Sequence, residues 1–384
     1  MPNKTIQFLA LSLVFFSALG SAIGASAEEK KIDRVRTKAL SKGVLDDSDL
    51  RVIDDFVSAS LEDLVHAEDY TELAEVRCSI SDRKGRSGQN QYTAAFLMSA
   101  RKHISRSLET VDSFEDNRLK IELYRNLAVL VVELENADLV HLIFPLLDHT
   151  NTTVHYWAVK ALSSDSVLAK LNAAVPDKEF SDKIIGALQS HIATSKPETL
   201  SLIVDFASNL EHPRTIQILR DIADVRIKSY EDWSVEQELM DAALLKAIAS
   251  VIVNPAFSSD KPLLGRKFAQ LYSYVIQRYM ATESLGERSK LHLASVIVDV
   301  ESSTLSSLIG KRQSTIKKAV ESGSFSSLQR ACDLLLGSST AAGSLPTALR
   351  FTYGKENGKT LTGPKKLPVR PKPKVEVIPE NPGS

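Results

Sequence analysis

Residues 139–162, LVHLIFPLLDHTNTTVHYWAVKAL, contain two apolar helical patterns separated by a short polar turn. In the second pattern Val154 and Ala158 are four residues apart, which places both side chains on one face of an α-helix. Asn151 precedes that pattern, where its side chain can accept hydrogen bonds from the first-turn amides. Pro145 lies inside the first pattern, where it removes a backbone donor and bends the helix. The stretch therefore predicts two packed helices joined by a capped turn.

The same periodicity extends over most of the chain. Only seven prolines occur between Glu28 and Gly363, and the strict alternation typical of strands is almost absent. The connections are short, so we expect consecutive helices to pack antiparallel as hairpins. The predicted fold class is all-α, with helices near residues 52–65, 90–111, 115–134, 138–147, 151–162, 177–195, 197–209, 213–229, 234–253, 262–281, 284–300 and 324–336.

Residues 139–162 resemble a single HEAT repeat. In that family a proline is common in the first helix, where Pro145 stands, and an aspartate caps the second helix, where Asn151 stands. The first helices of successive pairs begin about 37 to 49 residues apart, which brackets the period of HEAT and armadillo arrays. The resemblance implies an irregular HEAT-like α-solenoid of antiparallel helix hairpins.

Two histidines depart from the family pattern. HEAT repeats commonly carry an aspartate early in the turn and an arginine after the valine, and these form a ladder between neighbouring repeats. Here the two positions are His149 and His155. Two neutral imidazoles offer at most one ordinary hydrogen bond, whereas aspartate and arginine can form a charge-assisted pair. We therefore expect the ladder to be absent in this repeat.

The sequence gives no local signature of catalysis or cofactor binding. His149 and His155 could bind a metal with Asp148, but their spacing does not place them on one helix face and no third ligand is evident. Neither a nucleophile elbow nor a phosphate-binding loop occurs. We therefore expect a noncatalytic protein with no cofactor and no bound metal.

The first 27 residues have the layout of a secretory signal peptide. Lys4 precedes an apolar run from Ile6, and small residues lead to the Ala-x-Ala motif that ends at Ala27. An uncleaved membrane anchor is the alternative, because residues 6–24 are roughly long enough to span a bilayer. The motif and the abrupt change to charge at Glu28 favour cleavage. We expect a periplasmic or secreted protein with no membrane span after cleavage.

Charge and cysteine content restrict the partners and the scaffold. The 47 Lys and Arg residues nearly balance the 48 Asp and Glu residues, so the whole chain has no field that would draw nucleic acid. The two cysteines, Cys78 and Cys332, are too few for a disulfide-stapled scaffold. Both are expected to be buried free thiols, and a single disulfide between them is the alternative.

Residues 341–384 are predicted to be a disordered tail rich in proline and lysine. The segment from Gly363 carries six prolines and few large apolar side chains, so it cannot bury enough surface to offset its ordering entropy. Its cations could tether the protein to an anionic envelope polymer in a salt-dependent way. The candidate tether residues are Lys365, Lys366, Arg370, Lys372 and Lys374.

The sequence thus predicts a signal peptide at 1–27, an N-terminal helical region at 28–135, HEAT-like repeats at 136–340 and a tail at 341–384. The expected function is protein binding or scaffolding in the periplasm or cell envelope through the helical-repeat surface. The candidate partner contacts are His155, Tyr156 and Lys160. Two alternatives stay open: an enzyme or ligand carrier whose site is assembled from distant residues, and an envelope structural protein held by its basic tail.

Overall fold

The computed structural model of the chain describes residues 27–41, 44–85, 90–281 and 285–370. Within these ranges the protein is all-α, and its two short strands form one hairpin near the end. The chain divides into two compact units, which we call unit 1 (residues up to Asp116) and unit 2 (residues from Asn117). Among the described residues, none of the helices combines the length and the apolar character that crossing a membrane requires.

Unit 1 is built around its second helix. Helix α2 contacts the other three helices of the unit, and its buried face carries Phe56 and Leu64. Helix α2 begins with a capping box. The Asp46 side chain accepts amide hydrogens of the first turn, and the Asp49 side chain accepts the Asp46 amide hydrogen. The helices of unit 1 are α1 (Ala27–Leu40), α2 (Asp47–His66), α3 (Tyr70–Asp82) and α4 (Asn90–Asp112).

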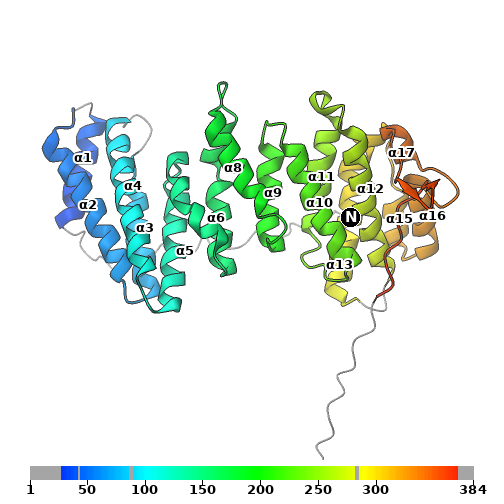
Figure 1. The fold of residues 1–384 in the computed structure, drawn as a ribbon, viewed down its shortest axis with the longest axis horizontal. Coiled ribbons are helices and arrows are strands. Elements are labelled where there is room, and N and C mark those ends of the chain that lie inside the picture. The colour runs from blue at the N-terminus through cyan, green and yellow to red at the C-terminus, as the bar shows by residue number, and fades with distance from the viewer. Residues whose placement is uncertain (1–26, 42–43, 86–89, 282–284, 371–384) are drawn as a thin grey trace, which may run out of the picture. The chain divides into compact units, whose positions relative to one another are not determined.

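Unit 2 contains a series of helices in which each packs mainly on its near neighbours in the chain. Helix α6 contacts α5 and α9, α9 contacts α11, and α12 contacts α10, α11 and α13. Figure 1 shows α5 to α12 side by side in chain order, from cyan-green to yellow. This arrangement is compatible with a helical solenoid. The helical elements up to residue 280 are α5 (Asn117–Glu133), η1 (Ala137–Asp148), α6 (Thr152–Leu162), α7 (Asp165–Leu171), α8 (Lys178–Ser190), α9 (Pro197–Asn209), α10 (Thr215–Glu231), α11 (Met240–Val253), η2 (Pro255–Phe257) and α12 (Lys261–Met280).

The end of unit 2 is made of shorter elements. They are α13 (Glu287–Val300), η4 (Glu301–Leu305), α14 (Ser306–Ile309), α15 (Thr315–Glu321), α16 (Phe325–Leu336), α17 (Ser344–Leu349), β1 (Lys355–Glu356) and β2 (Lys359–Thr360). Element η4 is a π-helical turn that continues α13, and it brings the buried Glu301 carboxylate to the first amides of α15. Those amides have no partner inside their own helix, so the carboxylate satisfies them.

The compact units divide at residue 116, because α5 packs against α6 and η1 and so belongs with the following helices. The expected boundary at 135, between an N-terminal helical region and HEAT-like repeats, stays a prediction. One element differs from the sequence expectation. The element that contains Pro145 is a 3-10 helix and not an α-helix. Proline has no amide hydrogen to donate to the residue four positions earlier, so an α-helix here would lack one backbone hydrogen bond.

The prediction of a disordered tail is wrong for residues 341–370. Buried Leu345 and Leu349 anchor α17, and the Tyr353 hydroxyl donates to the Leu336 carbonyl at 2.7 Å. The strands β1 and β2 are joined by Asn357 and Gly358, both with positive φ, as a tight hairpin turn requires. Residues 371–384, which carry part of the predicted tail, lie outside the described residues.

The segment after the hairpin runs back along unit 2. Figure 1 shows it in red beside the last helices. We call residues 364–370 the strap, because their backbone is hydrogen-bonded to side chains of α12 and of the α10–α11 loop. The composition of the tail is polar, but the main chain of the strap forms hydrogen bonds with side chains of unit 2.

A buried ion pair joins α10 to the start of α11. The Arg226 guanidinium donates to both carboxylate oxygens of Asp241, at 2.7 and 3.0 Å, and to the Glu236 carbonyl at 3.0 Å. Arg226 is 2% exposed and Asp241 is 0% exposed. The Tyr230 hydroxyl also donates to Asp241, at 2.7 Å. Burial, followed by the Asp241 charge, raises the pKa of Tyr230 well above its usual value, so the phenol keeps the proton that it donates.

Replacing Asp241 with Asn should destabilise the protein by about 3–5 kcal/mol, because Arg226 would be left buried without its counter-charge. Urea unfolding followed by circular dichroism measures this loss. The control is Lys228→Ala, which removes an exposed pair with Asp232 in the same helix and should leave the unfolding midpoint unchanged. An Asp241→Asn variant as stable as the wild type would contradict the role given to the pair.

Candidate functional site

The turn between η1 and α6 is organised by its polar side chains. Asn151 caps α6, as predicted: its Oδ1 accepts the Thr153 and Val154 amides at 2.9 and 3.3 Å. The Nδ1 atom of His149 accepts the Asn151 amide at 3.0 Å. Because that nitrogen is an acceptor, His149 is neutral and its proton is on Nε2. The turn is thus fixed by two local acceptors.

His155 joins this turn to the next helical pair. Its Nδ1 lies 2.7 Å from the Leu147 carbonyl oxygen, which can only accept, so Nδ1 donates; its Nε2 lies 3.1 Å from the Ser195 hydroxyl oxygen. His155 thus links neighbouring elements through Ser195, a contact that uses neither His149 nor an ion pair and is therefore different from the aspartate-arginine ladder. The sequence expectation concerned only that ladder and did not foresee this link.

His191, at the end of α8, lies beside His155. We call His149, His155, His191 and Asp148 the joint. The ring of His191 lies 5.5 Å from the ring of His155, and its Nε2 is 3.7 Å from a carboxylate oxygen of Asp148. Burial is the main cause that lowers the pKa of His191, with the Asp148 charge acting in the opposite direction. Burial, then the Lys120 charge, lowers the pKa of His149 as well. Among the described residues, these side chains and the other His, Cys, Asp and Glu residues form no group that could hold a metal ion.

The three predicted partner contacts occupy different positions. Both ring nitrogens of His155 bond inside the protein, so its role is structural in this geometry. Tyr156 is half-buried, and its ring packs edge-on against Trp157 at 5.7 Å. Lys160, one turn further along α6, lines a cleft. Of the three, Lys160 is the one that faces an open site.

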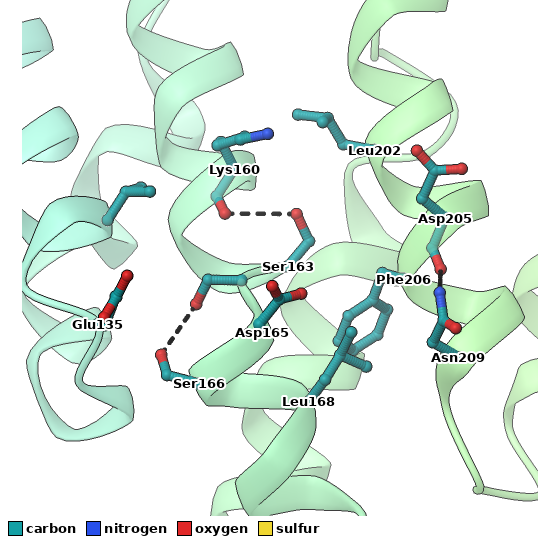
Figure 2. A pocket seen from close by; sticks show the side chains of 12 residues that line it. Glu135, Lys160, Ser163, Asp165, Ser166, Leu168, Leu202, Asp205, Phe206 and Asn209 are labelled. Carbon is teal, nitrogen blue, oxygen red and sulfur yellow. Dashed lines mark hydrogen bonds between the residues drawn. The ribbon is translucent and has the colours of Figure 1, made fainter. Parts of the chain in front are cut away.

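The cleft lies where α5, α6, α7 and α9 meet (Figure 2). Its volume is about 590 Å³, and its floor includes the buried ring of Phe206. The lining residues are Val132, Glu135, Lys160, Ser163, Ser164, Asp165, Ser166, Leu168, Leu202, Asp205, Phe206 and Asn209. Figure 2 shows charged and apolar side chains interspersed around the cleft, with Leu202 at the same level of the view as Lys160.

The rim of the cleft is mainly acidic. Three carboxylates, of Glu135, Asp165 and Asp205, stand against the single ammonium group of Lys160. Within the described residues, the side chains of Lys160, Asp165 and Asp205 make no ion pair and no hydrogen bond. The hydroxyls are partly used internally, because Ser163 donates to the Val159 carbonyl at 2.8 Å and Ser164 lies 3.2 Å from Ser166. The cleft therefore offers solvated charges to a ligand.

The predicted tether residues and cysteines are placed as follows. Lys365, Lys366 and Arg370 have exposed side chains on the strap, while Lys372 and Lys374 lie outside the described residues. Cys332 is a buried free thiol, and burial raises its pKa to about 12. Cys78 is a free thiol too, but it is exposed, contrary to the expectation of burial.

Comparison of the chain with models of known protein families and with curated protein sequences finds no match. The fold defines the class of the protein as all-α with packed helices. The functional argument therefore depends on the two sites, the joint and the cleft.

The joint should make stability depend on pH. His149 and His191 have lowered pKa values in the folded state, so below the usual value of 6.5 the unfolded chain binds more protons and stability falls. The free energy of unfolding should therefore decrease between pH 7.5 and pH 5. In the His149→Asn, His191→Asn double variant the decrease should be smaller, because asparagine keeps an acceptor and does not titrate. An identical pH profile in the two proteins would contradict this role.

Proposed function

We propose that the chain is a noncatalytic protein-binding or scaffolding protein of HEAT-like architecture, exported to the periplasm or cell envelope. Supporting the architecture, the Asn151 cap and the pair η1–α6 follow the repeat pattern of residues 139–162. His155 then supplies a bond to the next pair, in the position where HEAT repeats carry their ladder residue. On this proposal the helix pairs form antiparallel hairpins that stack into a solenoid.

The observation that carries the proposal is the cleft around Lys160. Its lining comes from several elements of the series, α5, α6, α7 and α9, and stacked helices build binding surfaces in this way. The side-chain charges of Lys160, Asp165 and Asp205 find no partner within the described part of the chain, so they can meet complementary charges of a partner. The half-buried side chain of Leu202 in the lining offers apolar surface of the kind found at the centre of interfaces.

The chemistry of the rim indicates the partner. The carboxylates of Asp165 and Asp205, with the ammonium group of Lys160, favour a basic segment that also carries at least one acidic residue to meet Lys160. Export supports a protein of the envelope as the partner, since the first 27 residues have the layout of a signal peptide. The exposed cations of the strap could add a salt-dependent tether to an anionic envelope polymer.

Charge reversal in the cleft should weaken partner capture. The mature chain, residues 28–384, immobilised and exposed to envelope extract, should retain a protein that Asp205→Lys binds at least about fivefold more weakly, which corresponds to a loss of about 1 kcal/mol. Asp63→Lys is the matched control: Asp63 is an exposed aspartate inside α2 of unit 1, so its reversal should leave capture unchanged. Retention of nothing at any salt concentration, or equal loss in both variants, would contradict the proposed function.

A further inference from the structure

The strap is held through its main chain. The Lys365 amide donates to Oε1 of Gln270 at 2.9 Å, and the Lys365 carbonyl accepts from Gln270 and Gln277 at 3.3 and 3.1 Å. The Leu367 amide donates to Oε1 of Gln277 at 2.7 Å. The indole nitrogen of Trp233 donates to the Pro368 carbonyl at 2.9 Å. We call Trp233, Gln270, Gln277 and Arg278 the strap-binding surface.

This mode of contact depends little on the identity of the strap residues. Gln270 and Gln277 are about two helical turns apart on α12, so their amide groups face the same side and follow an extended chain. The side chains of the strap are mostly exposed, and Val369 is 94% exposed. The prolines at 364 and 368 favour an extended backbone and lower the entropy lost on docking. The surface thus recognises an extended peptide by its backbone.

Arg278 is a buried cation that the strap leaves unsatisfied. The residue is 8% exposed, and its guanidinium lies 4.3 Å from the centre of the Trp233 ring. Its Nε and Nη1 atoms are buried and have no hydrogen-bond partner among the described residues. Buried donors without acceptors cost free energy, and for a charged group the cost is larger. Two buried donors of Arg278 thus remain without an acceptor while the strap is bound.

The charges around Arg278 also fit the strap poorly. Burial and then the positive charge of Arg370 lower the pKa of Arg278, whereas Tyr230 and Glu238 act in the opposite direction. Glu238 lies within electrostatic range, but it forms no hydrogen bond to Nε or Nη1. The strap places a like charge where the surface offers a cation. A carboxylate in that place could accept both free donors in a charge-assisted contact.

We propose that the strap-binding surface is a binding site for an extended, proline-containing peptide of another protein that carries a carboxylate where the strap carries Arg370. The strap is a weaker occupant of the same site, bound within the chain, and the partner peptide displaces it. This site rests on the proposed protein-binding function but is separate from the cleft at Lys160. A loss of peptide binding and a loss of capture by Asp205→Lys are therefore distinguishable outcomes.

The test uses the mature full-length chain with Lys365→Pro and Leu367→Pro, which removes the two amide hydrogens that the strap donates and leaves the surface intact. The probes are fluorescent peptides of residues 361–371: the native sequence, LTGPKKLPVRP, and one with glutamate in place of Arg370. Fluorescence anisotropy should show the acidic peptide binding at least about tenfold more tightly than the native one. The wild-type chain should bind the acidic peptide at least about tenfold more weakly than the variant does, because its own strap competes.

Two controls tie binding to the proposed contacts. An acidic peptide methylated at the amide nitrogens of the residues that correspond to Lys365 and Leu367 should bind at least about tenfold more weakly, because it lacks both donors. Adding Gln277→Ala to the strap variant should weaken the binding of both peptides. Full affinity in either control would overturn the backbone recognition.

The carboxylate preference has its own test. Adding Arg278→Gln to the strap variant should remove the advantage of the acidic peptide and keep the binding of the native one. If the Arg278→Gln variant binds neither peptide, the deciding variant is Arg370→Glu in the otherwise wild-type chain. Its own strap should bind more tightly, so hydrogen exchange of the Lys365 and Leu367 amides should slow at least about tenfold. Unchanged exchange there would overturn the proposal. Equal affinity of the two peptides for the strap variant would also overturn it and would indicate exchange of straps between copies.

Discussion

The α10–α11 loop depends on one buried ion pair. Arg226 reaches Asp241 at the start of α11 and the Glu236 carbonyl inside the loop, so it holds both ends of the connection together. The loop contains Trp233 and Gln237 with positive φ, a conformation that non-glycine residues rarely adopt and that surrounding contacts must maintain. The indole of Trp233 binds the strap and stacks with Arg278. A polar contact in the core of unit 2 thus positions a surface that recognises peptide backbone.

The helices could be predicted from the sequence because apolar spacing is a local property. The spacing places α2, α9, α10 and α12 within a few residues of their observed bounds, and Asn151 caps α6 as its position before the apolar pattern indicates. Polar residues that bond locally could also be interpreted. The His155 contact with Ser195 could not, because it joins residues 40 positions apart through tertiary packing.

Two kinds of feature were missed, for different reasons. That residues 341–370 are folded had a local signal, because Asn357-Gly358 lies between short polar strands and the buried Leu345 and Leu349 lie nearby. The interpretation gave more weight to the composition of the whole tail. The cleft had no such signal, since Asp165 and Asp205 look like solvated helix residues until α7 and α9 pack together. Similarly, Gln270 and Gln277 look like ordinary helix surface until the strap arrives about 90 residues later.

Hydrogen exchange of the Asp241→Asn variant tests most directly whether the ion pair organises the strap-binding surface. Compared with the wild type under native conditions, amide protection should fall in residues 229–240 and in residues 364–370 together, while α5 to α9 keep their protection. The coupling is expected because Trp233 can hold the Pro368 carbonyl only while Arg226 holds the loop. Loss of protection in the loop with an unchanged strap, or an even loss through all of unit 2, would contradict this account.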